Sequence, residues 1–202
     1  MPEHHQASAA AFGVVRRVVG ALFILPVLIA PATAQADDEA ANKPHFVTGI
    51  VKGDLHNGCY AKSVPDATWG MKGTTRVYVV RRGKDRLVAT FPWYARKLHL
   101  QCRRGPDGAM TVAIVRLGPW QRGQRASKDH LAVAFYEGGR ELARYSTLAL
   151  AGRPDNVRPS VSHYRVIKRV KGFVEPSHFR LALIDGRILT FDLATGKLRR
   201  SK

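Results

Sequence analysis

The sequence has little cysteine, little negative charge and no long apolar run. It holds two Cys, and 15 Asp and Glu stand against 33 Lys and Arg, which leaves a net charge of +18 over 202 residues. A c-type haem attachment motif, a phosphate-cradling glycine motif and a Gly-x-Ser-x-Gly nucleophile elbow are absent from the sequence. The scarce acids fall mainly in turn contexts, where Asp closes or caps the turn, and no carboxylate pair stands out for a glycosidase. The sequence therefore names no catalytic residue, and we expect no cofactor.

The longest apolar run, Val18–Ala30, has thirteen residues, whereas a membrane-spanning helix needs roughly 20. It follows a pair of arginines and precedes two small-x-small motifs that end at Ala34 and Ala36. This order of basic, apolar and small residues is typical of a cleavable export signal. We therefore predict a signal peptide over residues 1–36, cleaved after Ala34 or Ala36, with an uncleaved anchor as the alternative.

The export signal determines how the rest of the chain is interpreted. Residues 37–44 are polar and expected to be a disordered lead-in, and residues 45–202 are enough for a single β-rich domain with its own core. No other segment approaches membrane length, so we expect no transmembrane span in the mature chain. The predicted location is periplasmic or secreted.

From residue 46 onward, short β-branched or aromatic runs alternate with turn residues. Leu98, Leu100 and Cys102 alternate with polar residues, which is the period of two expected for a half-buried strand. The dipeptide Asp185-Gly186 is favoured in two-residue type I′ hairpin turns. The expected strands are Phe46–Lys52, Thr75–Arg81, Arg86–Phe91, Tyr94–Cys102, Met110–Leu117, Leu131–Tyr136, Glu141–Leu150, Val161–Val170, Phe179–Ile184 and Arg187–Leu193.

The links between neighbouring strands are mostly short, and short links require antiparallel pairing because parallel strands need a crossover. No convincing amphipathic helix of ten or more residues appears in the mature chain. The sequence therefore predicts an all-β fold, either an antiparallel β-sandwich or a flattened barrel of about ten strands with little helix. Three longer loops are expected at Gly53–Thr74, Gly118–Asp129 and Ala151–Pro159, and long loops on a rigid sheet often carry function.

The two cysteines indicate a disulfide first, because an exported protein meets an oxidising environment. We therefore predict a Cys59–Cys102 bond that ties the first long loop to a strand. One alternative follows from spacing, since His56, Cys59, His99 and Cys102 would together supply a Cys2His2 ligand set for zinc or copper. Against it, His99 and Cys102 are three apart on a strand and should point to opposite faces. We expect the disulfide and no metal.

Ser162 and His163 offer the best nucleophile and base for a hydrolase. Adjacent residues on a strand face opposite ways, and a nucleophile and its base usually come from distant segments. This hydrolytic site is therefore kept, with the histidine and cysteine set, as the alternative to a binding function.

Aromatic residues interleaved with cations form the remaining pattern. Aromatic rings beside guanidinium groups bind sugar rings or unstacked bases, although these rings could instead pack the core or hold loops down. The candidate ligand-binding residues are Trp69, Trp93, Tyr94, Trp120, Arg122 and Arg125.

The net charge of +18 attracts anionic partners. Export removes cytosolic nucleotides and chromosomal DNA from these partners, so no specific nucleic acid is expected. Anionic polymers and lipid head groups of the cell envelope remain, as does a protein partner. The sequence thus favours a non-enzymatic exported binding or accessory protein, and charges spread over a solvated surface are the alternative.

Overall fold

A computed structural model describes residues 41–51, 54–105, 107–174 and 177–199; for Ile50 and residues 54–56 it describes the backbone alone. The chain divides into two units, residues 1–33 and 34–202, and every described residue belongs to the second. The predicted export signal and residues 37–40 of the predicted lead-in lie outside the described residues.

The structure is 59% strand and 3% helix, which confirms the predicted all-β class, and it is sandwich-like. In the described part of the chain, fifteen strands form four antiparallel sheets, where about ten strands were predicted. The first sheet contains β1 (His45–Val51), β2 (Asp54–Pro65), β3 (Gly73–Arg81) and β4 (Lys84–Phe91) in that order. The second contains, in order, β5 (Leu98–Arg104), β6 (Met110–Leu117), β8 (Leu131–Glu137) and β9 (Arg140–Ser146).

The remaining elements follow β9 or join the sheets. The third sheet contains, in order, β12 (Ile167–Val174), β13 (His178–Leu183), β14 (Ile188–Asp192) and β15 (Leu198–Arg199). A small sheet has the order β10 (Arg158–Pro159), β11 (His163–Arg165) and β7 (Gln121–Arg122). The helix α1 (Thr147–Ala151) follows β9 directly.

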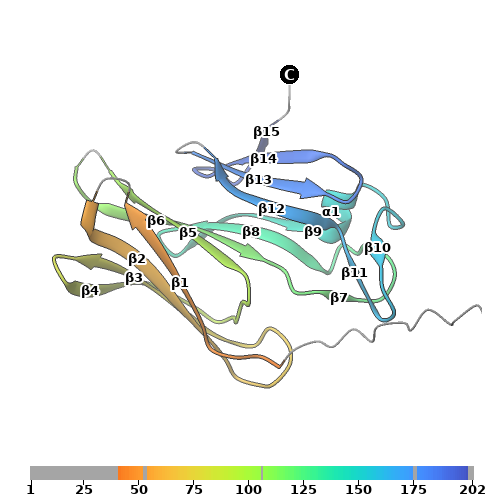
Figure 1. The fold of residues 1–202 in the computed structure, drawn as a ribbon, viewed down its shortest axis with the longest axis horizontal. Coiled ribbons are helices and arrows are strands. Elements are labelled where there is room, and N and C mark those ends of the chain that lie inside the picture. The colour runs from red at the N-terminus through yellow and green to blue at the C-terminus, as the bar shows by residue number, and fades with distance from the viewer. Residues whose placement is uncertain (1–40, 52–53, 106, 175–176, 200–202) are drawn as a thin grey trace, which may run out of the picture. The chain divides into compact units, whose positions relative to one another are not determined.

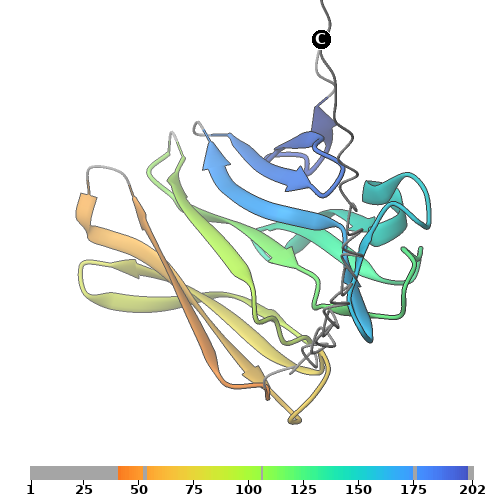
Figure 2. The same cartoon turned by 45° about the vertical axis from the view of Figure 1, so that its right-hand side comes forward.

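The second sheet is covered on both faces. Along β6, Val112 and Ile114 belong to a buried cluster shared with the first sheet, whereas Val115 and Leu117 belong to a cluster shared with the third. Neighbouring residues of a strand point to opposite faces, so the two clusters lie on opposite sides of β6. The β5-β6-β8-β9 sheet is therefore a middle layer between the first and third sheets (Figures 1 and 2).

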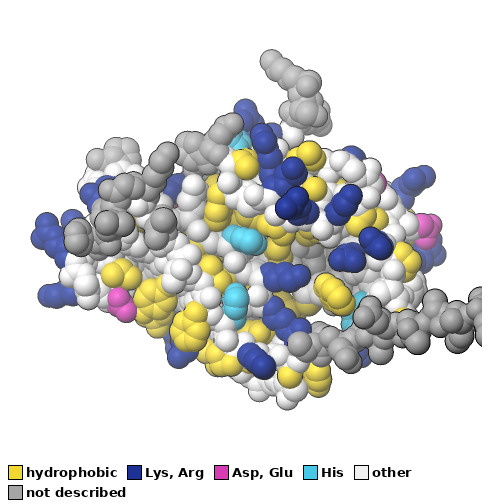
Figure 3. Space-filling view, in the orientation of Figure 1, with side chains coloured by type: hydrophobic (Ala, Val, Ile, Leu, Met, Phe, Trp, Pro, Cys, Tyr) yellow, Lys and Arg dark blue, Asp and Glu magenta, His cyan; other side chains and the backbone are white. Residues whose placement is uncertain are grey.

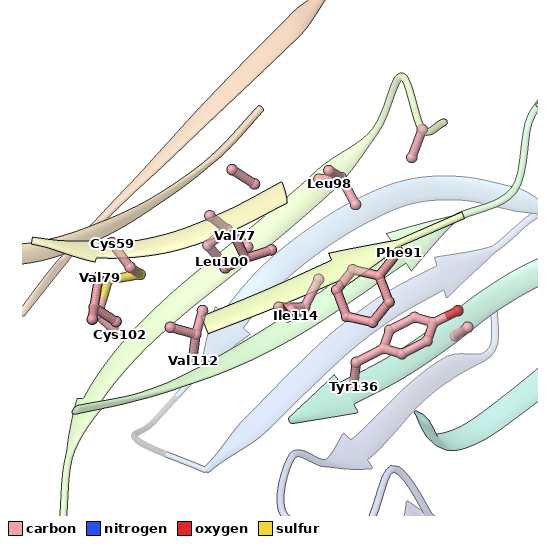
Figure 4. Packing of buried hydrophobic residues seen from close by; sticks show 14 of the residues in the cluster. Cys59, Val77, Val79, Phe91, Leu98, Leu100, Cys102, Val112, Ile114 and Tyr136 are labelled. Atoms are coloured by element: carbon pink, nitrogen blue, oxygen red, sulfur yellow. A yellow bond between two sulfur atoms is a disulfide. The ribbon is translucent and has the colours of Figure 1, made fainter. Parts of the chain in front are cut away.

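The predicted disulfide is confirmed, and it lies between the first and second sheets. Cys59 of β2 and Cys102 of β5 are bonded, with Cα atoms 5.8 Å apart and both side chains buried among residues such as Val79 and Leu100 (Figure 4). Gly49 of β1 faces this bond, and a Cβ there would lie 2.8 Å from Cys102 Sγ. The disulfide thus ties two layers together, rather than a loop to a strand.

The long loop predicted over Gly53–Thr74 is wrong, because β2 occupies most of it and only residues 66–72 remain as a loop. The buried positions of β2 are Cys59, Ala61 and Ser63, which are too small or too polar to produce an apolar alternation. Ser63 is accommodated because its hydroxyl lies 2.7 Å from Thr75 Oγ1 and accepts a hydrogen bond from the backbone of Ala95 at 2.9 Å.

Two predicted strands are also corrected. The strand predicted over Glu141–Leu150 ends at Ser146, whose hydroxyl caps α1 by accepting a hydrogen bond from Ala149 N at 3.1 Å. The strand predicted over Val161–Val170 divides at Val166 into β11 and β12, which belong to different sheets. The two other predicted loops hold the short strands β7 and β10.

The turn at Asp185-Gly186 differs from the predicted two-residue type I′ turn. Leu183 N donates to Arg187 O at 2.8 Å, which leaves a three-residue loop, and only Gly186 has a positive φ (89°). The Asp185 carboxylate instead accepts hydrogen bonds from Arg187 N and from Asn156 Nδ2 at 2.7 Å. Two consecutive positive φ values, as type I′ requires, occur at Arg82-Gly83 and at Gly138-Gly139.

Candidate functional site

Trp69 lies in the 66–72 loop and is half exposed (50%). Asn42 holds this loop, because its Nδ2 donates to Ala67 O at 3.1 Å and to Gly70 O at 2.9 Å. Arg96 Nε donates to Asn42 Oδ1 at 2.9 Å and holds the Asn42 side chain in turn. The loop backbone is therefore bonded in place while the indole remains in contact with solvent.

Trp120 is 45% exposed and directly precedes β7. Like the Trp69 loop, its backbone is held by hydrogen bonds on both sides. Gly118 N donates to Ala132 O at 2.9 Å, and this approach is so close that a Cβ at Gly118 would lie 1.8 Å from Leu131 O. On the other side of Trp120, Gln121 Nε2 donates to Leu131 O at 2.9 Å. Both tryptophans thus stand exposed on fixed backbone, which is how binding residues are usually presented.

Three hollows share Trp120 in their walls. The Trp69 hollow, of about 410 Å³, lies between Trp69 and Trp120. The Lys168 hollow, of about 210 Å³, has walls from the ends of β6 and β8 and from the β11–β12 segment. The Ser160 hollow, of about 80 Å³, lies beside His163 and Tyr164. We call the three together the Trp120 surface.

The Trp120 surface has cations in its walls but no acid among the described residues that line it. Two lysines and five arginines contribute: Arg96, Lys97, Arg122, Arg158, Arg165, Lys168 and Arg169. Within the described residues, Arg122, Arg165 and Lys168 form no ion pair, whereas Arg103, Arg144 and Arg187 elsewhere are paired with carboxylates. Figure 3 shows Lys and Arg side chains gathered over β12 and its surroundings, with Asp and Glu near the margins of that face.

A hydrogen-bond chain under this surface determines which nitrogen of neutral His130 carries the proton. Thr147 Oγ1 donates to Ser127 O at 3.0 Å, so it accepts from the Tyr164 hydroxyl, 2.8 Å away. The Tyr164 hydroxyl, with its own proton used, accepts from His130 Nδ1 at 2.7 Å. Neutral His130 is therefore protonated on Nδ1, and its Nε2 is a hydrogen-bond acceptor beside the Trp69 hollow.

The structure brings together three of the six candidate binding residues, Trp69, Trp120 and Arg122. Trp93 and Tyr94 are instead buried. The ring of Trp93 stacks on Phe91 with centroids 4.8 Å apart, and the guanidinium of Arg116 lies 4.3 Å from its centroid. The sixth candidate residue, Arg125, lines none of the three hollows and is paired with Asp155 at 2.9 Å.

The alternative metal site is not assembled among the described residues. The sulfur atoms of Cys59 and Cys102 are bonded to each other, and His99 lies on the other face of β5, with its ring centroid 5.3 Å from that of Phe179. Burial lowers the pKa of His99 and so favours its neutral form. The side chain of His56 lies outside the described residues. In the described part of the chain, no three His, Cys, Asp or Glu side chains form a group that could hold a metal ion.

The prediction that Ser162 and His163 face opposite ways is wrong. Ser162 lies in a bend before β11, and its hydroxyl is 2.7 Å from His163 Nδ1. In the same turn, Ser160 Oγ donates to His163 O at 2.9 Å. His163 lies beside Trp120, with ring centroids 6.4 Å apart.

Two participants in the site were missed from the sequence. Asn42 falls in the segment predicted to be disordered, and no local pattern predicts its contacts with a loop 25 residues away. His130 stands directly before a strand without any motif around it. The cationic segment around Lys168 is visible in the sequence, but only the fold places it beside Trp120.

Comparisons of the chain with protein-family models, with curated proteins and with solved structures find no match. Among the residues that the structure describes, no helix is long and apolar enough to cross a membrane.

Proposed function

We propose that this chain is an exported, non-enzymatic binding protein and that its Trp120 surface binds an anionic component of the cell envelope. The observation that carries the proposal is the composition of the three hollows. Seven cations and two exposed tryptophans line them, and no acid does so among the described residues. Concave surfaces lined by one sign of charge concentrate counter-ions and speed their association.

The disulfide supports the exported location. Buried between two layers, the Cys59–Cys102 bond is typical of proteins that fold in an oxidising compartment. The basic, apolar and small-residue order of the first 36 residues points the same way. Envelope polymers and lipid head groups are the anions that such a protein meets.

Heparin, a soluble acidic polymer, is the first probe. We expect the wild-type protein to bind it, and the affinity to fall by at least about tenfold as salt rises from about 50 to about 300 mM, because salt screens exposed charges. The variant Arg122→Ala/Arg165→Ala/Lys168→Ala should lose about tenfold or more of the affinity at low salt, since it removes at least one cation from each of the three hollows of the Trp120 surface.

A matched control removes the same net charge elsewhere. Arg76, Lys84 and Arg86 are exposed on the first sheet and line none of the three hollows. The variant Arg76→Ala/Lys84→Ala/Arg86→Ala should therefore lose less than about threefold of the affinity, since only long-range charge is reduced. Equal losses in the two triple variants would show that the affinity for heparin depends on net charge alone and not on the Trp120 surface. The absence of heparin binding at low salt would refute the proposal outright.

A further inference from the structure

The Trp69 hollow contains more than charge, because two flat aromatic surfaces face solvent in its wall. Trp69 and Trp120 come from separate loops and are 50% and 45% exposed. An exposed indole is the best side chain for contact with a sugar ring or a base, since its face is apolar and electron-rich. Anion binding alone would not need either indole.

Both indoles are presented without a large ordering penalty. The Trp69 loop is closed by the hydrogen bond from Asp66 N to Lys72 O at 3.1 Å and held by Asn42. The Trp120 segment is held by the bonds that Gly118 and Gln121 make with the start of β8. Ligand binding is stronger when the receptor need not be ordered first.

The polar groups of the hollow match a hydroxylated anion. His130 Nε2 is an acceptor when the ring is neutral, so a ligand hydroxyl can donate to it. Arg122 lies in the same wall and has no carboxylate partner among the described residues, so it can pair with a ligand carboxylate. A hydroxyl donor and a carboxylate on one small ring are the groups of a uronic acid.

We infer that the Trp69 hollow is a saccharide subsite that takes one uronic acid residue of an acidic glycan. The sugar ring packs against an indole, a ring hydroxyl donates to His130 Nε2, and the carboxylate meets Arg122. The inference rests on the proposed function, because it names the ligand class of the same surface. The inference differs from the proposed function because it requires a ligand with a ring, which a simple polyanion lacks.

Three probes of matched charge distinguish a surface that requires a sugar ring from one that requires negative charge alone: an oligogalacturonate, inorganic polyphosphate and an oligothymidylate. Trp69→Ala and Trp120→Ala should each weaken oligogalacturonate binding by about tenfold, the typical loss of one stacked ring. Polyphosphate has no ring, so its affinity should change by less than about twofold in both variants. Trp69→Phe, which keeps an aromatic face, should restore most of the oligogalacturonate affinity.

Tryptophan fluorescence of the wild-type protein provides a readout that requires no variant. Trp93 is buried, so its emission is a constant background, while contact of a sugar with Trp69 or Trp120 should shift the exposed emission to shorter wavelength. Oligogalacturonate should produce this shift and polyphosphate should not.

The outcomes distinguish the inference from the proposed function. If polyphosphate and oligogalacturonate both fail to bind at low salt, the proposed function is wrong. If polyphosphate binds, but the tryptophan variants leave oligogalacturonate affinity unchanged and no emission shift occurs, the inference of a saccharide subsite is wrong. Binding to the Trp120 surface then depends on the charge of the ligand alone. Tighter binding of oligothymidylate than of oligogalacturonate would overturn the inference in favour of stacked bases.

Discussion

At the scale of single residues, a hydrogen bond with Asp85 changes the pKa of Tyr60. Its hydroxyl donates to Asp85 Oδ2 at 2.7 Å, and this hydrogen bond raises the pKa of Tyr60 to about 12 from an ordinary value of 10.0. The folded-state pKa lies above the unfolded value, so the contribution to stability is complete below pH 10 and is lost as the pH rises from 10 to 12. Tyr60 also stacks on its cross-strand neighbour Tyr78 in the first sheet, with ring centroids 4.8 Å apart.

Asp85→Asn should return the pKa of Tyr60 toward 10, because it removes the carboxylate that accepts the phenolic proton. The check is an alkaline titration of tyrosinate absorbance. Burial also raises the pKa of Tyr136, so a Tyr60→Phe variant is needed to identify which late-titrating component belongs to Tyr60. Asp155→Asn, at a carboxylate paired with Arg125, serves as the control. An unchanged late component in Asp85→Asn would contradict the assignment.

At the scale of elements, the turn of the β3–β4 hairpin contains a residue whose backbone conformation is unfavourable. Arg81 pairs with Lys84, and Arg82 and Gly83 form the two-residue link with φ values of 51° and 74°. In the described residues Arg82 is the only non-glycine with a positive φ. A left-handed conformation costs an ordinary L residue about 1 kcal/mol or more, whereas Asn tolerates it.

Arg82→Asn should therefore raise the free energy of unfolding by about 0.5–1 kcal/mol, since Asn-Gly is the preferred type I′ pair. Urea denaturation measures the change. Arg81→Asn, one residue earlier in β3, should lower stability instead, because Asn is disfavoured within strands. Equal effects of the two substitutions would show that charge removal, and not turn geometry, is responsible.

Irregularities in β12 contribute directly to the Trp120 surface. The pairing of β12 with β13 skips Lys168 and Lys171, so each is the extra residue of a bulge. A bulge interrupts the alternation of faces and redirects a side chain, and Lys168 lines a hollow. Bulges and lysines also protect edge strands from pairing with other chains, and β12 is an edge strand. Strand alternation in the sequence predicts a smooth strand here and cannot reveal the bulges.

At the scale of the whole molecule, the sequence predicts the class but not the number of layers. The antiparallel all-β fold and the disulfide follow from turn residues, strand lengths and two cysteines. A middle layer is also visible in principle, since Val112–Val115 is an unbroken apolar run of the kind found in strands buried on both faces. β2 is not visible, because small and hydroxyl side chains fill its buried positions, and the Ser63 hydroxyl is satisfied only by Thr75 of β3 and by Ala95 in the link between β4 and β5.

The candidate site was predictable only in part for a similar reason. Trp69, Trp120 and Arg122 can be chosen from the sequence as aromatic and cationic loop residues, but Trp93 fits the same description and is core. What separates them is whether a side chain meets another layer, and layers are set by contacts far apart in the chain. Nothing local distinguishes Arg125, which is paired with Asp155, from Arg122, which faces the hollow.

The measurement that tests the Trp120 surface most directly is a titration of isotope-labelled protein with heparin, observed through the indole N–H signals of its three tryptophans. Single Trp→Phe variants assign the signals. We predict that the signals of Trp69 and Trp120 shift in a salt-dependent manner, while that of buried Trp93 stays in place. If heparin binds while the Trp69 and Trp120 signals remain unmoved, the anion is held elsewhere on the molecule and the Trp120 surface is not the binding site.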